Sequence, residues 1–264
     1  MRLCILIFCI WGALVCAPSQ EIEPISQRAR NFFEIQSPKI LSYQDTKYKI
    51  FIAKTKADAK RYKVLFLLDG NALFSQYLNS YLDSPKQDLL VIGVGYEDNF
   101  AFNIPKRTKD YTPMVLGKEF EKGGGSLDFF NFFKRKLLPY IRQHYPINTS
   151  YQGIFGHSFG GLFVLWSLLQ ESGLFSHYFI VSPSLWWGEA SFLPDNILIK
   201  KCPKIFLLKG SEERIRSKNP QTDMINFAER LEKESFCFPE IKIFINETHG
   251  SVIKKALDFT KKSF

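Results

Sequence analysis

Uninterrupted runs of apolar residues are the most regular feature of this sequence. The first is Tyr62–Leu68 (YKVLFLL), and similar runs follow it along the chain. A strand that is apolar at every position is buried on both faces, which is typical of parallel sheets. We therefore predict such strands at Tyr62–Leu68, Asp88–Val94, Gln152–Phe155, Tyr178–Val181, Ile205–Leu208 and Ile241–Ile245. Two further strands are predicted nearer the N-terminus, at Asn31–Gln36 and Lys47–Ala53.

Helical patterns separate these runs, at Phe129–Tyr145, Phe159–Gln170, Gln221–Glu234 and Ser251–Lys261. The alternation predicts an α/β fold with a mostly parallel central sheet, helices on both faces and a ligand site at the carboxyl ends of the strands. One long connection, Tyr96–Leu127, has little periodicity and contains three consecutive glycines. Loops of that length in a compact domain are usually functional, so we expect this one to line the active site.

The N-terminus has the layout of a signal peptide. One early cation precedes an apolar run that ends near Val15, and small residues follow. The run is too short to favour a membrane span, and no later segment approaches that length. We predict that residues 1–19 are a signal peptide, that 20–264 form a single domain, and that the mature protein is periplasmic without a membrane span. An uncleaved anchor is the alternative, because Pro18 is an awkward residue directly after a cut at Ala17.

The composition is that of an ordinary globular chain with an excess of positive charge. The 264 residues are 45% hydrophobic and carry a formal net charge of +9. The cations are scattered rather than clustered, and an exported protein rarely meets nucleic acid, so we expect no nucleic-acid partner. An anionic small molecule is the partner that the charge favours.

Two cysteines, Cys202 and Cys237, lie outside the leader. Each comes just before a predicted strand, and if those strands are neighbours, both thiols lie at the same edge of the sheet. An oxidising compartment would let them form a disulfide worth roughly 3–4 kcal/mol. Two buried free thiols are the alternative.

The segment Gly156–Gly161 (GHSFGG) matches the nucleophile elbow G-x-S-x-G. A predicted strand ends directly before it and a predicted helix begins directly after it, which is the context that the elbow requires. Small residues surround Ser158 because the turn is tight and holds the hydroxyl above the sheet edge. We therefore predict an α/β-hydrolase fold with Ser158 as the nucleophile, against the alternative of a glycine-rich turn with an inert serine.

A serine hydroxyl needs a base, and the chain has only four histidines. His157 lies inside the elbow, whereas His144 and His177 belong to a helix end and a strand start. His249 follows the last predicted strand, where this fold places its histidine. We therefore predict His249 as the general base, against the alternative of an ordinary surface histidine.

The acid of a triad is expected after the preceding strand, in Gly210–Arg214 (GSEER). We choose Glu213, because the residue three positions after the glycine often faces the histidine loop in such folds. Glu212 is the alternative, and a solvated charged loop without a role is a third possibility. The oxyanion hole is expected to combine the amide of Phe159 with that of Gly70 or Asn71.

Several segments together resemble the esterase family that includes enterochelin esterases, in particular its exported hydrolases of trilactone siderophores. The matching segments are Phe66–Phe74 (FLLDGNALF), Val91–Tyr96 (VIGVGY), Arg107–Pro113 (RTKDYTP), GHSFGG, Ser182–Trp187 (SPSLWW) and Thr248–Val252 (THGSV). They extend over most of the mature chain. The resemblance implies hydrolysis of ester bonds in a catecholate trilactone such as enterobactin, often as its ferric complex. It also implies that a Ser-His pair alone can suffice, which would leave Glu213 without a role.

Three residues are candidates for binding such a substrate. Trp186 and Trp187 follow a predicted strand at the ligand end of the sheet, where indoles can stack on catechol rings. Arg107, in the long connection, is placed to attract an anionic iron complex. The alternatives are core packing for the tryptophans and a structural ion pair with Asp110 for the arginine.

No spacing of His, Cys or carboxylate residues suggests a metal site in the protein, so we expect no cofactor, with iron arriving only inside the substrate. A general carboxylesterase, thioesterase or feruloyl-type esterase is the alternative function. A binder that captures a catecholate without cleaving it is a further one, although it would need neither Ser158 nor His249.

Overall fold

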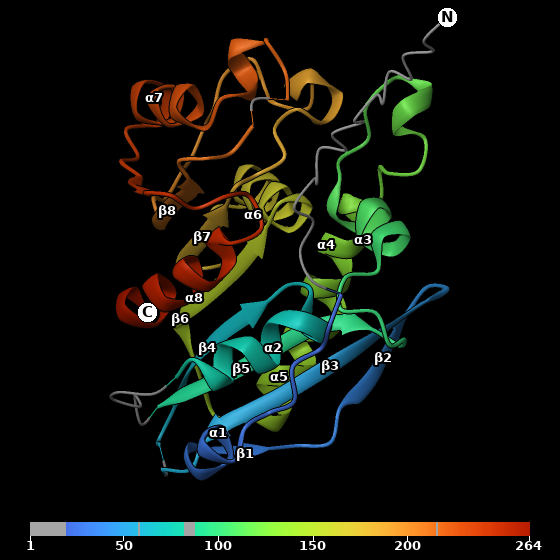
Figure 1. The fold of residues 1–264 in the computed structure, drawn as a ribbon, viewed down its shortest axis with the longest axis vertical. Helices are drawn as coiled ribbons and strands as arrows, with labels where there is room; N and C mark the ends of the chain where they lie inside the picture. Colours follow the sequence, from blue (N-terminus) through green and yellow to red (C-terminus); the bar gives the residue numbers. More distant parts are fainter. Residues whose placement is uncertain (1–19, 58, 82–87, 215) are drawn as a thin grey trace, which may run out of the picture.

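The computed structural model describes residues 20–57, 59–81, 88–214 and 216–264, so the predicted signal peptide lies outside the described residues. Its central feature is one twisted sheet (Figure 1) with the strand order β1-β3-β5-β4-β6-β7-β8-β9, and β2 pairs with β3. Strands β5, β4, β6, β7, β8 and β9 run parallel to one another, whereas β1, β2 and β5 are antiparallel to β3. The strands are β1 Phe33–Ile35, β2 Lys39–Tyr43, β3 Thr46–Thr55, β4 Tyr62–Leu67, β5 Leu89–Tyr96, β6 Ile147–His157, β7 His177–Val181, β8 Lys204–Gly210 and β9 Glu240–Phe244.

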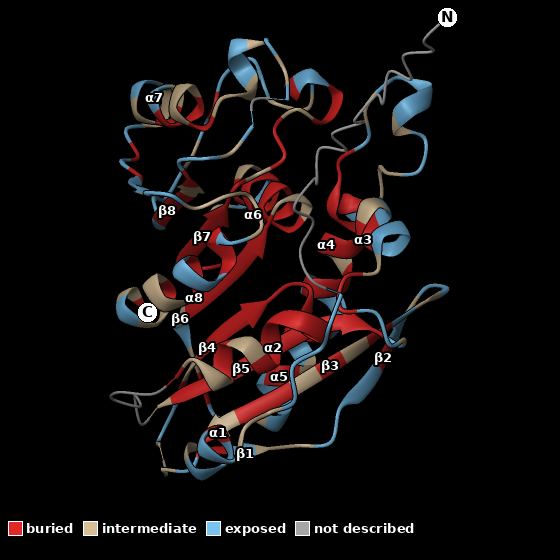
Figure 2. Ribbon diagram, in the orientation of Figure 1, coloured by how far each residue is buried: buried red, intermediate tan, exposed pale blue. Residues whose placement is uncertain are grey.

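Helices cover both faces of this sheet. Side chains from α2 and α8 share one buried cluster with one face of the strands, and side chains from α4, α5, α6 and α7 share the other. The inner strands are buried throughout (Figure 2), as continuous apolar runs require. The helices are α1 Gln27–Phe32, α2 Gly70–Asn79, α3 Ile104–Tyr111, α4 Ser126–Phe132, α5 Leu138–His144, α6 Phe159–Gln170, α7 Met224–Ser235 and α8 Val252–Ser263. A π-helical turn, Phe133–Leu137, joins α4 to α5, and short 3-10 turns lie at Lys118–Phe120, Trp187–Ala190 and Pro220–Thr222.

The predicted α/β fold is confirmed, with differences near the N-terminus. The segment predicted as one strand, Asn31–Gln36, divides into the end of α1 and the short β1. The strand β2 and the helix α2 were not predicted. Most of α2 is buried, so its sequence lacks the polar face by which an amphipathic helix is detected.

The long connection Tyr96–Leu127 is not a single irregular loop. It contains α3, whose start is capped by the side chain of Asn103, which accepts a hydrogen bond from the amide of Lys106. Residues 118–120 form a 3-10 turn. The polar composition of both elements hides them from a search for hydrophobic periodicity.

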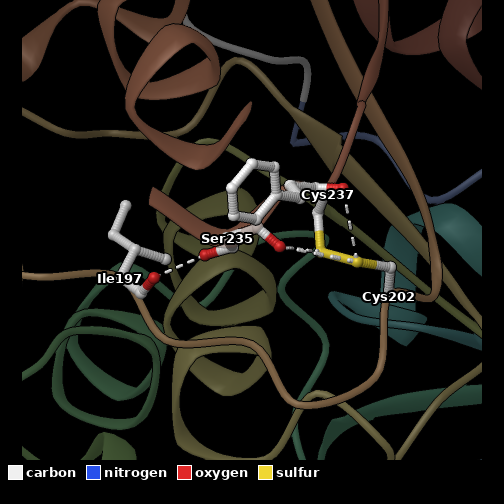
Figure 3. The surroundings of a disulfide bond; sticks show 5 residues. Ile197, Cys202, Ser235 and Cys237 are labelled. Atoms are coloured by element: carbon white, nitrogen blue, oxygen red, sulfur yellow. Dashed lines mark hydrogen bonds between the residues drawn. A yellow bond between two sulfur atoms is a disulfide. The ribbon is translucent and has the colours of Figure 1, made fainter. Parts of the chain in front are cut away.

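Cys202 and Cys237 form a disulfide (Figure 3) with their Cα atoms 5.5 Å apart. Their strands, β8 and β9, are neighbouring and parallel, which places both cysteines at the amino ends of those strands. The disulfide therefore ties the outermost strand to the sheet, and the alternative of two free thiols is wrong.

Replacing both cysteines with alanine is expected to lower the free energy of unfolding by about 3–4 kcal/mol, because the disulfide closes a long loop in the unfolded chain. Urea unfolding of the wild type and of the double variant, each with and without a reducing agent, measures this. The reducing agent should destabilise only the wild type. Equal stability of the two proteins under oxidising conditions would contradict the prediction.

Among the described residues, none of the helices combines the length and apolar character that crossing a membrane requires.

Candidate active site

Ser158 lies at a strained turn between β6 and α6. Its φ of 60° and ψ of −117° are unusual for a residue other than glycine. Neighbouring positions leave no room for a side chain, since a Cβ atom on Gly156 would lie 2.3 Å from the Gly160 carbonyl oxygen and one on Gly161 would lie 2.5 Å from that of Val181. The small residues of the motif therefore permit the turn that holds Ser158 at the carboxyl edge of the sheet.

The structure brings Ser158, His249 and Glu213 into one hydrogen-bonded relay. His249 Nε2 lies 3.0 Å from Ser158 Oγ, and His249 Nδ1 lies 3.1 Å from Glu213 Oε2. Each residue follows a different parallel strand, β6, β8 or β9, so the carboxyl edge of the sheet assembles all three. The relay has the geometry in which a base withdraws the serine proton while a carboxylate orients the base.

Glu213 is held as a carboxylate by its surroundings. Burial raises its pKa, but hydrogen bonds from His249, from the Ser182 hydroxyl and from the Gly210 amide outweigh burial and hold the pKa below the ordinary value. Glu212, the alternative acid, is exposed and accepts a hydrogen bond from Ser211 Oγ. Of the two glutamates, only Glu213 contacts His249 in the described structure.

His157 also contacts the histidine loop. Its Nε2 lies 2.7 Å from the carbonyl oxygen of His249, which can only accept, so Nε2 carries the proton and donates. Burial, together with the nearby His249 and Arg107, lowers the pKa of His157 well below its usual range. We infer that His157 stays neutral and fixes the backbone of the loop that carries His249.

The predicted oxyanion-hole residues lie at the starts of two helices. Phe159 is the first residue of α6, and Gly70 and Asn71 are the first two residues of α2. Amides in the first turn of a helix have no partner within that helix and are free to bind an anion. The side chain of Asn71 is bonded to the amide and the carbonyl of Tyr96, which ties the start of α2 to the end of β5.

The prediction that Arg107 binds substrate is wrong, and so is its alternative pairing with Asp110. Its side chain is only 7% exposed, and Nε and Nη2 each lie 2.9 Å from a carboxylate oxygen of Asp69. Nη2 also donates to the carbonyl oxygen of His157 at 3.2 Å. Arg107 therefore joins the loop after β4 to the nucleophile elbow, while Asp110 accepts a hydrogen bond from the Tyr96 hydroxyl.

The two tryptophans have different environments. Trp187 is 4% exposed, donates through Nε1 to the carbonyl of Pro113 and packs edge-on against Phe120, so its predicted contact with substrate is wrong and the alternative of core packing holds. Trp186 is partly exposed and lines a cavity beside His249, with the guanidinium of Arg216 over its ring at 5.3 Å. Trp186 therefore remains a candidate for contact with substrate.

The cavity beside His249 has a volume of about 530 Å³ and a basic lining. The loop from the end of β8 to the turn Pro220–Thr222 supplies most of its polar residues. Its basic residues are Lys209, Arg214, Arg216 and Lys218, and its acidic residues are Glu213 and Asp223. None of the residues that line this cavity comes from Tyr96–Leu127, the connection that was expected to line the active site.

Two serines in the loop after β7 were not predicted as part of the site. Ser182 and Ser184 contact Glu213 and Ser158, respectively. The motif SPSLWW was the signal that could have identified them, since it contains both serines. Within the described part of the chain, no group of three or more His, Cys, Asp or Glu residues is arranged to hold a metal ion.

The sheet order, the elbow and the relay together define a member of the α/β-hydrolase class with the site of a serine hydrolase. Comparison with known sequences identifies the family, since the profile of the Esterase family ("Putative esterase") matches residues 42–230. The chain belongs to this family.

Curated relatives are named as siderophore esterases. The chain is 32% identical over 182 residues to the apo-salmochelin esterase of Escherichia coli, covering 64% of this chain and 57% of that protein. It is 33% identical over 164 residues to the ferri-bacillibactin esterase BesA of Bacillus subtilis, covering 55% of this chain and 56% of that protein. The chain thus spans a little over half the length of these two relatives.

A solved structure extends the likeness to nearly the whole chain. The BES protein from Bacillus cereus superposes with a TM-score of 0.72 at 28% identity, covering 92% of this chain and 98% of that one.

Proposed function

We propose that this protein is a serine esterase that hydrolyses the ester bonds of a catecholate trilactone siderophore of the enterobactin type, including its ferric complex. The observation that carries the proposal is the Ser158–His249–Glu213 relay at the edge of a basic cavity. The relatives named as siderophore esterases support the substrate class. Iron belongs to the substrate in this proposal, and the protein needs no cofactor.

The chemistry follows from the positions of the three side chains. Ser158 attacks the ester carbonyl while its proton moves to His249 Nε2, and Glu213 stabilises the imidazolium. The amides at the starts of α6 and α2 donate hydrogen bonds to the carbonyl oxygen and stabilise the negative charge that develops on it. Collapse expels the alcohol, which takes the proton from His249, and a water molecule then repeats the sequence to release the acid and free Ser158.

The cavity suits an aromatic anion. The guanidinium of Arg216 lies over one face of the Trp186 ring, so a catecholate that reaches this part of the cavity meets an aromatic surface and a cation together. Lys209, Arg214 and Lys218 add further positive charge to the lining. A ferric catecholate complex carries several negative charges, whereas the iron-free trilactone does not, so this lining favours the ferric form.

We also propose that the protein is exported to the periplasm. A signal peptide at residues 1–19 would direct the chain there, and the Cys202–Cys237 disulfide is consistent with an oxidising compartment. In the periplasm the enzyme would meet siderophores that the cell has taken up.

The basic lining gives a specific prediction. Replacing Arg214 and Arg216 together with glutamine is expected to lower kcat/KM for the ferric substrate about 10-fold, because the attraction for an anion is reduced. Hydrolysis of an uncharged aryl ester should change by less than about 2-fold, because Ser158 and its partners are untouched. Steady-state kinetics at low and high ionic strength measures both, and added salt should reduce the difference for the ferric substrate.

A matched control removes the same amount of charge elsewhere. Arg135 and Arg142 are exposed and lie in the segment that leads into the amino end of β6, opposite the site. Their double replacement with glutamine should leave both activities unchanged. If it lowers ferric turnover as strongly, net charge rather than the cavity determines recognition.

The proposed function is tested with enterobactin itself. Wild type and Ser158→Ala are incubated with the free and the ferric siderophore, and the products are separated by chromatography. Linear products from the wild type alone support the proposal and show which form is preferred. If the wild type leaves both forms intact but cleaves a simple aryl ester, the siderophore assignment fails and a general carboxylesterase remains.

A further inference from the structure

The loop after β7 contacts both ends of the catalytic relay. Ser182 Oγ donates a hydrogen bond to Glu213 Oε1 at 2.6 Å, and Ser184 Oγ lies 3.2 Å from Ser158 Oγ. Both serines are almost completely buried, at 4% and 2% exposure. The amide of Ser184 also donates to the carbonyl oxygen of Ser158, which fixes the two residues relative to each other.

The contacts of Glu213 determine which atom donates in each hydrogen bond of the relay. Glu213 Oε1 already accepts from Ser182 Oγ and from the Gly210 amide, as a carboxylate does. Its other oxygen can then only accept from His249 Nδ1, so that nitrogen carries the proton. In the neutral ring Nε2 is consequently an acceptor, and Ser158 donates its hydroxyl proton to it.

This assignment leaves one possible donor between the two serines. Ser158 has a single proton, and that proton is directed to His249, so the hydrogen bond between Ser158 Oγ and Ser184 Oγ is donated by Ser184. We propose that Ser184 is a catalytic residue whose hydroxyl donates to Ser158 Oγ and stabilises the negative charge that develops there during attack and release. The inference rests on the proposed function, because it requires Ser158 to be the nucleophile.

The hydrogen bond from Ser184 to Ser158 becomes stronger during the reaction. As the proton moves from Ser158 to His249, the Oγ atom gains negative charge before its bond to the carbonyl carbon is complete, and Ser184 keeps its own proton throughout. A hydrogen bond to a charged oxygen is roughly twice as strong as one to a neutral oxygen. In the acyl-enzyme the Oγ atom is an ester oxygen and a poor acceptor. The interaction is therefore strongest near the transition states of both steps, which is the condition for a gain in rate.

Ser184→Ala tests the proposal with Ser167→Ala as the matched control. Ser167 is an equally buried serine on α6, and its hydroxyl bonds to the carbonyl of Val164 rather than to the relay. Stopped-flow acylation by a nitrophenyl ester and covalent labelling by a fluorophosphate both report attack by Ser158. Ser184→Ala is expected to slow both by about 10- to 100-fold, without weakening binding of an unreactive ester analogue. Ser167→Ala should react at the wild-type rate.

A second variant separates the hydroxyl from its surroundings. Ser184→Thr keeps the donor and should recover most of the rate, provided that thermal unfolding shows it to be folded; if it is not, the alanine variant decides alone. A folded Ser184→Ala protein that reacts at the wild-type rate would overturn the proposal. Weaker binding of the analogue in parallel with the rate would also overturn it, since that pattern indicates a structural role.

Failure of the proposed function gives a different pattern. If the wild type reacts with the nitrophenyl ester and the fluorophosphate but leaves enterobactin intact, the substrate assignment fails while the role of Ser184 is still decided. If the folded wild type is not labelled at Ser158, both proposals are overturned.

Discussion

Replacing Ser158 with alanine is expected to lower kcat for ester hydrolysis by roughly 10⁶-fold, the order of magnitude seen when a serine hydrolase loses its nucleophile. His249→Ala should cost about as much, because Ser158 Oγ lies 3.0 Å from His249 Nε2 and has no other base in contact with it in the described structure. The double variant should be no slower than either single variant, since the two residues act as a unit. Steady-state hydrolysis of an aryl ester, with thermal unfolding as the check on folding, measures all three.

The rate of the Ser158→Ala/His249→Ala double variant tests whether the two residues act in one step. Independent contributions would multiply, so a double variant far slower than either single variant would contradict a shared step. Retention of activity in Ser158→Ala with full loss in His249→Ala would indicate that His249 serves a different nucleophile. Ser167→Ala, which is remote from the relay, is the control for the loss of a buried hydroxyl.

The sequence predicted the central sheet because its strands are apolar at every position and alternate with helices. Strands β4, β5, β7, β8 and β9 were placed to within two residues at each end, whereas β6 begins five residues before the predicted Gln152. The helix α6 was placed to the residue, because the elbow marks where it begins. β1, β2 and α2 were placed poorly or missed. Polar and apolar residues do not alternate in β2 (KILSY), and α2 is buried on nearly all sides and lacks a polar face, so neither element shows the periodicity on which such predictions depend.

At the site, the roles of residues in or next to sequence motifs could be predicted. The roles of residues whose contacts depend on tertiary packing could not. Ser158 and His249 are positioned by the order of strands, so chain position alone indicated their proximity. The partner of Arg107 was not accessible in this way. Asp69 is 38 residues distant in the chain, and their ion pair depends on how α3 packs against α6. Trp187 likewise lies next to Trp186 in sequence, but its ring packs in the core while Trp186 lines the cavity.

The same reasoning explains why the basic cavity was not predicted. Arg214, Arg216 and Lys218 alternate with neutral residues in a loop of unremarkable composition. Only the fold of that loop over Trp186 brings their charges to one side of His249. The overall charge of the chain indicated an anionic partner, and the structure locates a lining with which such a partner can interact.

Replacing Glu213 with glutamine is expected to lower kcat by about 10³- to 10⁴-fold. Two donors, Ser182 Oγ and the Gly210 amide, point at Oε1, so the carbonyl oxygen of the glutamine side chain should take that position. Its amino group then faces His249 Nδ1 and donates to it. That arrangement moves the ring proton to Nε2, which can no longer accept the proton of Ser158.

Glu212→Gln is the matched control, because this neighbouring glutamate is exposed and contacts Ser211 instead of His249. It should retain wild-type kcat, measured with the same aryl ester. Glu213→Ala should be less impaired than Glu213→Gln, because alanine leaves His249 free to adopt the productive tautomer. A Glu213→Gln protein within about 3-fold of the wild type would mean that a Ser-His pair suffices and that the carboxylate contributes little beyond packing.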